Sequence, residues 1–248
     1  MTVGRINSYI DAAAWFFHSR KAIISLNYRM RKLSFLIPGL IGFATSGYAQ
    51  IQVSQEPRHH KVLENEWVRV LDVHIPPHDT SLMHKHSTPS VFLVLSKTKT
   101  GSQVLIEPHQ ISLTEGNIWF EGFYDTPRIH RVWNEDTVEF HVMDIELLHE
   151  PSSSVNINFT PPYCQSLFDE KHVHAFRVTL PPGVGFDLKK FVYNVLVIGL
   201  SGPHAAGLVN DEHFTKKGDF LFIPAGADIE IWNDSKSHEQ QFALLYLK

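Results

Sequence analysis

The chain has 248 residues, of which 43% are hydrophobic and 19% are charged, and its formal net charge is −4. This composition is typical of a globular protein with one or two compact units. The single cysteine, Cys164, excludes an intramolecular disulfide and any cysteine-rich zinc pattern, and we interpret it as a small buried hydrophobic residue.

The first 49 residues differ from the rest of the chain. Basic residues within 29–32 precede the apolar run 33–44, and Gly47-Tyr48-Ala49 places small residues where a signal peptidase cuts. The apolar run is short for a membrane span, so the pattern predicts a secretory signal peptide that is cleaved after Ala49. The alternative is an uncleaved N-terminal anchor.

Met30 stands where such a signal peptide would begin. We therefore interpret residues 1–29 as an upstream extension, whose translation N-terminal sequencing of the precursor would test. With cleavage, we expect a periplasmic or secreted protein that has no stable membrane span.

Removal of the leader makes the remaining chain more acidic. Residues 1–49 carry six basic groups and one acidic group, a net charge of +5, so the mature chain carries −9. An acidic surface repels phosphate groups, and we therefore expect no nucleic acid among the partners.

The mature part, 50–248, contains one set of five short segments twice, in the same order and about a hundred residues apart. In the first copy these are Trp67-Val68-Arg69-Val70, Ile75-Pro76-Pro77, Val91-Phe92-Leu93-Val94, Glu115-Gly116-Asn117-Ile118-Trp119-Phe120 and Val132-Trp133-Asn134-Glu135-Asp136. In the second they are Ala175-Phe176-Arg177-Val178, Leu180-Pro181-Pro182, Val195-Leu196-Val197-Ile198, Lys217-Gly218-Asp219-Phe220-Leu221-Phe222 and Ile231-Trp232-Asn233-Asp234-Ser235. Two copies at a long period indicate duplicated domains.

The predicted fold class is all-β. Apolar and β-branched runs alternate with Pro, Gly, Asp and Asn turns, and the mature chain shows no sustained apolar period of 3.6 residues. Short strands at this spacing favour a sandwich or barrel in each half. We expect the first domain at 50–148, a linker at 149–171 and the second domain at 172–248.

A His-x-His pair, His84 and His86, directly precedes the apolar run 91–95, and His130 lies in a second strand-like region, 128–134. Residues i and i+2 of a strand point to the same face, so the two imidazoles of the pair can converge on one point. Three neutral imidazoles suit one divalent transition metal ion, namely iron, manganese, zinc, nickel or copper, with open coordination positions. The alternative is that these histidines are hydrogen-bonded polar groups without a tightly bound metal.

These segments resemble the cupin superfamily over almost all of 50–248. His84 and His86 match its first motif, and Gly116, His130 and Asn134 match its second. The resemblance implies two tandem jelly-roll barrels and a metal-binding site in the first of them. Cupins serve many chemistries, so the resemblance leaves the reaction open.

The chain departs from the cupin pattern in both copies. Ser90 and Val91 stand where the first motif places a metal-binding glutamate, so the resemblance implies a site of three histidines. In the second copy, Phe186-Asp187-Leu188-Lys189-Lys190 replaces the His-x-His, and Ile229 replaces the last histidine. Since isoleucine binds no metal, we interpret the second barrel as structural or partner-facing.

Other polar residues are weaker candidates. Glu121, Tyr124 and Asp125 precede His130 and could line the barrel mouth as acid, base or ligand-orienting groups, although a solvated loop is the simpler interpretation. We interpret His141 as a histidine of a core strand, and His59-His60 as an exposed pair before the first strand.

Three functions fit these features. The first is a metal-dependent cupin enzyme, an oxygenase or isomerase acting on a small polar molecule. The second is a module that binds a small ligand or a metal without turnover. The third is a structural or interaction protein, for which edge strands make a homodimer plausible.

Overall fold

A computed structural model describes residues 50–104, 107–151, 161–202, 204 and 206–248, and the predicted leader at 1–49 lies outside them. The described part contains 19 strands and one short 3-10 helix, η1 (Val53–Gln55), which confirms the all-β fold class. None of the described helical segments has the length and apolar character needed to cross a membrane.

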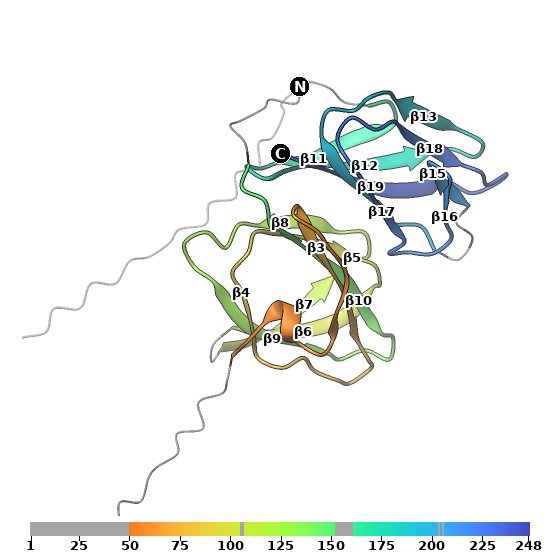
Figure 1. Ribbon diagram of the computed structural model, residues 1–248. Coiled ribbons are helices and arrows are strands. Elements are labelled where there is room, and N and C mark those ends of the chain that lie inside the picture. Colours follow the sequence, from red (N-terminus) through yellow and green to blue (C-terminus); the bar gives the residue numbers. More distant parts are fainter. Residues whose placement is uncertain (1–49, 105–106, 152–160, 203, 205) are drawn as a thin grey trace, which may run out of the picture. The chain divides into compact units, whose positions relative to one another are not determined.

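Strands β1 to β10 form two sheets of five strands, which surround the interior of the first barrel (Figure 1). In pairing order, the first sheet comprises β1 (Ile51–Gln52), β4 (His84–His86), β9 (Arg128–Asn134), β6 (Thr98–Val104) and β7 (Glu107–Leu113). The second sheet comprises β2 (His59–Glu64), β3 (Val68–Ile75), β10 (Phe140–Leu147), β5 (Ser90–Val94) and β8 (Ile118–Glu121).

Strands β11 to β19 form the second barrel, also from two sheets. In pairing order, one sheet comprises β11 (Cys164–Asp169), β12 (Val173–Leu180), β19 (Gln240–Leu247), β14 (Asn194–Gly199) and β17 (Phe220–Ile223). The other comprises β13 (Gly185–Leu188), β18 (Ile229–Asn233), β15 (Gly207–Val209) and β16 (Glu212–Phe214). The order β2-β3-β10-β5-β8 of the first barrel matches β11-β12-β19-β14-β17 of the second, as a duplicated unit requires.

The boundary between the barrels differs in one respect from the sequence prediction. Strand β11 lies inside the segment 149–171, which we expected to be a linker, and it pairs with β12. The paired strands of the second barrel therefore start at Cys164. This segment alternates little between apolar and polar residues because β11 is an outer strand, and all six of its residues are partly buried or exposed.

Two equivalent asparagines hold the same turn in each barrel. The side-chain amide of Asn134 donates to the carbonyls of Ile75 and Val138, at 3.0 and 2.8 Å. The amide of Asn233 donates to the carbonyls of Leu180 and His238, at 2.9 and 2.8 Å. The asparagine of the repeated segment is therefore a structural residue in both copies, because it satisfies buried backbone acceptors.

Strand β3 is buried on both faces, because its sheet separates two cores. Leu71, Val73 and Ile75 point into the first barrel, where they pack with Phe140 and Val142. The alternate residues of β3 and its neighbours form a core that both barrels share: Val68, Val70, Val91, Leu93, Leu95, Met143, Ile145, Leu147, Val173, Ala175, Leu196, Ile198, Leu200, Ala243, Leu245 and Leu247. This shared core joins the two barrels through their equivalent sheets.

The interior of the second barrel is a hydrophobic core. Phe186 and Ile229, which stand where the cupin pattern has histidines, are both buried in it together with Ile231 and Phe242. The residues that replace the ligands therefore fill the space that a site would need.

We predict that Ile145→Ala lowers the free energy of unfolding by about 2–5 kcal/mol, because the truncated side chain leaves a cavity in the shared core. Urea unfolding at equilibrium measures this loss. Val192→Ala is the matched control, since Val192 is 71% exposed and we expect a change below about 0.5 kcal/mol. Equal effects of the two substitutions would contradict a shared core at Ile145.

Candidate metal centre

The three predicted histidines meet inside the first barrel. Strands β4 and β9 are antiparallel neighbours, and their register sets His84 directly opposite His130. His86 follows two residues after His84 and therefore points to the same face. The three ring centroids lie 4.7 to 5.0 Å apart, and His84 and His86 are 1% and 3% exposed.

The rings face one another edge to face. The planes of His84, His86 and His130 cross at angles of 65° to 71°. The lone pair of an imidazole nitrogen lies in the plane of its ring, so inclined planes allow several lone pairs to meet at one point. This geometry is compatible with binding of a common ion.

The outer nitrogens of His84 and His130 have hydrogen-bond partners, whereas that of His86 has none among the described residues and lies near a buried carboxyl. Nδ1 of His84 donates to the carbonyl of Leu82 at 2.9 Å, and Nδ1 of His130 lies 3.2 Å from the hydroxyl of Ser102. Nδ1 of His86 lies 3.4 Å from Asp144, whose carboxyl is fully buried. Hydrogen bonds of this kind orient histidines that bind metals, and the bond from Nδ1 of His84 to a carbonyl selects the tautomer of His84 with Nε2 free.

The inner nitrogens of His84 and His86 are spaced as two ligands of one cation would be. Nε2 of His84 and Nε2 of His86 are 3.1 Å apart, close to the roughly 2.9–3.4 Å expected for two ligands at about 2.1 Å from one ion. Since Nδ1 of His84 is a donor, the proton between these two nitrogens belongs to His86, and a metal ion would displace it. Nε2 of His130 is buried and has no hydrogen-bond partner among the described residues.

Burial keeps the three imidazoles neutral. It lowers the pKa of His84 to about 4 and the pKa of His130 to about 3, and neighbouring histidines add to the shift. The pKa of His86 is lowered well below its usual value, first by burial and then by His130 and His84. Neutral imidazole is the form that binds metals, so protons compete weakly for this site.

A cavity of about 410 Å³ opens beside the three histidines. Its lining is mainly apolar: Val73, Ile75, Phe92, Val104, Leu113, Trp119, Phe123, Val132, Phe140 and Val142. Phe92 and Trp119 stack at 5.1 Å, and Phe123 stacks on His86 at 5.4 Å. The polar lining residues outside the histidines are Ser102, Glu121, Arg128 and Asp144.

The three weaker candidates differ in their positions. Glu121 lines the cavity, and its carboxylate pairs with Arg128 at 3.2 Å. Tyr124 is 53% exposed and stacks on His172 at 5.7 Å, and it is not among the residues that line this cavity. Asp125 is exposed and also does not line it.

His59 corrects the sequence interpretation. We expected His59-His60 to be an exposed pair, but only His60 is exposed, whereas His59 is 9% exposed and lines the cavity. Its ring centroid is 4.7 Å from that of His84. A backbone bulge that follows His59 removes the simple alternation on which sequence interpretation depends.

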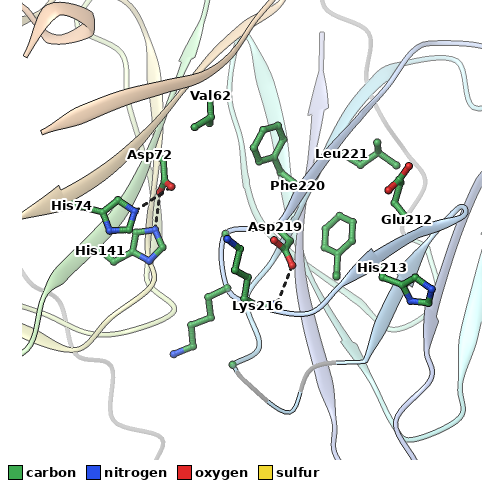
Figure 2. Close-up of a pocket in the computed structure, with 14 residues that line it drawn as sticks. Val62, Asp72, His74, His141, Glu212, His213, Lys216, Asp219, Phe220 and Leu221 are labelled. Carbon is green, nitrogen blue, oxygen red and sulfur yellow. Dashed lines mark hydrogen bonds and ion pairs between the residues drawn. The ribbon is translucent and has the colours of Figure 1, made fainter. Parts of the chain in front are cut away.

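A second group of ligand-type side chains lies on the outer face of β3 and β10. Figure 2 shows Asp72 between His74 and His141, at 3.1 and 2.7 Å from their Nε2 atoms, at the edge of a cleft of about 800 Å³. His141 therefore lies in a strand as predicted, but with an ionic partner. The rings of His74 and His141 are stacked at 4.2 Å and 21°, so their lone pairs run nearly parallel.

This outer group is better described as an ion cluster than as a metal site. Hydrogen bonds to Asp72, partly opposed by burial, raise the pKa of His74, as expected for a charged imidazole beside a carboxylate. Lys216 and Lys217 line the same cleft, and their positive charges disfavour a cation there.

Comparison with known proteins supports the fold. No family model matches the sequence, and no curated protein matches it. Salicylate 1,2-dioxygenase from Pseudaminobacter salicylatoxidans is similar with a TM-score of 0.53 and 10% identity, over 79% of this chain and 78% of that one. AerE from Microcystis aeruginosa is similar with a TM-score of 0.52 and 12% identity, over 78% of this chain and 98% of that one.

A cupin 2 conserved barrel domain protein from Leptotrichia buccalis is similar with a TM-score of 0.49 and 10% identity, over 76% of this chain and 88% of that one. The chain has a cupin fold. At these identities the likeness establishes the fold alone, and the cupin fold supports many chemistries, so the function has to be inferred from the site.

We predict that the metal-free protein loses stability as the pH falls from about 7 towards 4. The unfolded chain takes up protons at its histidines below about 6.5, whereas His84 stays neutral in the fold down to about 4. The unfolded state therefore binds more protons in this range. The loss for His84 alone is on the order of 3 kcal/mol, and urea unfolding at several pH values measures it.

His84→Asn should reduce this pH dependence, because it removes one buried neutral imidazole. His213→Asn is the control, since His213 is exposed on β16 of the second barrel. An identical pH dependence in the wild type and in His84→Asn would contradict the prediction.

Proposed function

We propose that the first barrel holds one divalent transition metal ion on His84, His86 and His130 and acts as a metal-dependent oxygenase on a small molecule. The observation that carries this proposal is that three imidazole rings with inclined planes lie within 5.0 Å of one another, centroid to centroid, at the wall of a cavity. Such an ion would supply Lewis-acid or redox activation of a bound molecule.

The charge of the site favours an anionic substrate. Three neutral ligands leave the full charge of a divalent ion uncompensated, because Ser90 stands where the cupin pattern places a glutamate. Arg128 adds a second positive group in the lining of the cavity. The carboxylate of Glu121 holds this guanidinium and orients it until an anionic substrate competes for it.

The cavity wall favours an apolar or aromatic body on that anion. Phe92, Trp119 and Phe123 supply flat apolar surfaces on which a ring can pack, and the cavity volume of about 410 Å³ suits a small molecule. The sequence had led us to expect a small polar substrate. We now propose a small carboxylic acid with an apolar or aromatic body.

The reaction class rests on two features. One solved structure with this fold is a salicylate 1,2-dioxygenase, an enzyme that by its name uses an aromatic acid. In this chain, Arg128 would bind the carboxylate, and the aromatic wall would exclude water from the reacting atoms. Oxygenation also needs no free acid or base from the protein, which fits this lining better than isomerisation does.

Binding without turnover is a second candidate. Neither carboxyl group in the cavity lining is exposed as a free base, since Glu121 pairs with Arg128 and Asp144 is buried 3.4 Å from Nδ1 of His86. Burial, together with Glu146, raises the pKa of Asp144 well above its usual value. A barrel of this kind would capture a small acid even if it did not transform it.

The proposed location is the periplasm or the cell exterior, and the leader at 1–49 supports it. N-terminal sequencing of the mature protein tests this, with Gln50 expected as the first residue.

We predict that the protein, purified without chelators, contains close to one equivalent of iron, manganese, nickel, zinc or copper. His84→Ala/His86→Ala and His130→Ala should each lose most of it, because each removes inner nitrogens of the centre. Elemental analysis measures the metal, and circular dichroism verifies the fold. His213→Ala, in the second barrel, should keep its metal, and full retention in the His84/His86 and His130 variants would refute the site.

We also predict that Arg128→Gln weakens binding of small aromatic carboxylic acids about tenfold or more, because it removes a charge-assisted hydrogen bond. Calorimetry against acids and their uncharged amides measures this effect, and oxygen uptake with the same panel separates turnover from capture. Arg131→Gln is the control, since Arg131 lies on the same strand and bonds Gln103 outside the cavity lining. Equal affinity for acids and amides would contradict an anionic substrate.

A further inference from the structure

We propose that His59 is a fourth protein ligand of the metal ion and that Glu56 holds it in position. The inference rests on the proposed function and adds to it, because it assigns a ligand from outside both repeated motifs. It also explains how this barrel compensates for the glutamate that the cupin pattern has and this chain lacks.

The strand carrying His59 directs the ring inwards. β2 pairs with β3, and His59 lies opposite Val73, whose side chain belongs to the interior core of the first barrel. A bulge between Lys61 and Leu63 then shifts the register. Because of this shift, Leu63 packs against the shared core on the opposite face of the sheet, while His59 remains inside.

Glu56 holds the outer nitrogen of this ring. Its carboxylate lies 2.6 Å from Nδ1 of His59, and it also accepts the backbone N–H groups of Arg58 and Leu82, at 2.7 and 2.9 Å. Each oxygen of the Glu56 carboxylate thus accepts a backbone N–H group. The carboxylate acts as an acceptor here, and Nδ1 of His59 is its donor.

With Nδ1 bonded to Glu56, Nε2 is the nitrogen of His59 that could bind an ion. One ligand nitrogen each of His59, His84 and His86 lies within 4.8 Å of the others. The plane of His59 crosses those of His84 and His86 at 63° and 64°, with centroids 4.7 and 6.4 Å away. These inclinations match those within the three-histidine group, and the close spacing of the ligand nitrogens would let His59 share an ion with His84 and His86.

Glu56 also links the two segments that carry the ligands. Its bond to the backbone of Leu82 fixes the entry to β4, and the carbonyl of Leu82 in turn accepts from Nδ1 of His84. A single buried carboxylate thus orients His59 directly and His84 through one intervening residue. Carboxylates in this relation to metal-binding histidines raise their basicity and fix their rings.

A fourth imidazole has a different effect from a glutamate. It is neutral, so the ion keeps its full positive charge towards a substrate anion, and as a nitrogen donor it suits zinc, copper, iron or nickel better than magnesium or calcium. Four protein ligands still leave open positions on an ion that accepts five or six.

Titration of the metal-free protein with Co²⁺ tests this assignment, read by the visible absorption of the ion and by its dissociation constant. We expect His59→Gln to weaken Co²⁺ binding at least about tenfold and to change the absorption spectrum, since a nitrogen ligand is lost. Glu56→Gln should weaken binding about tenfold with a smaller spectral change. His60→Gln is the matched control, because this neighbouring ring is exposed and should leave both readouts unchanged.

The outcomes separate this inference from the function on which it rests. If His59→Gln binds Co²⁺ like the wild type while His130→Gln does not, His59 is no ligand and the three-histidine centre stands. If both variants bind like the wild type, the centre itself is refuted. X-ray absorption of the Co²⁺-loaded wild type needs no variant: four imidazoles around the ion support the inference, and three overturn it.

Discussion

The first barrel depends on one constraint: each buried imidazole must be held on its outer side so that its inner nitrogen faces a common point. Leu82 and Ser102 hold His84 and His130, and Glu56 holds His59 in the same way. These partners come from separate segments, so the surrounding strands must close before the rings are aligned. Each buried nitrogen that lacks a hydrogen-bond partner lowers the stability of the fold by about 1–3 kcal/mol. A cation bound to these nitrogens would remove that loss.

The two barrels separate the frame of the fold from its chemistry. Asn134 and Asn233 make equivalent hydrogen bonds to the carbonyls of the neighbouring strand end, and the strand order of the equivalent sheets is the same. The interiors differ, since Phe186 and Ile229 fill the second with apolar side chains. The repeated segments therefore encode strands and turns, and a few interior positions decide whether a barrel contains a polar site or a hydrophobic core.

The sequence could predict those parts of the molecule that depend on local periodicity. The short apolar runs indicated the strands, the repeat indicated two units, and the i, i+2 spacing of His84 and His86 placed both rings on one face. Features that depend on strand pairing were missed: His59 was placed before the first strand, whereas it begins β2 and lies opposite Val73. Glu56 and Ser102 have no motif at all, because their roles arise only from pairing between distant segments. The strand β11 was also missed, since an outer strand needs little apolar alternation.

The core shared by the barrels has a consequence for the second barrel. Met143 and Ile145 of the first barrel are covered by the apolar face of the second, which includes Leu196 and Leu245. Removal of the second barrel would expose this large apolar surface to water and favour aggregation. The second barrel therefore covers the first although it lacks the His-x-His pair, and its interior residues can change as long as the shared face stays apolar.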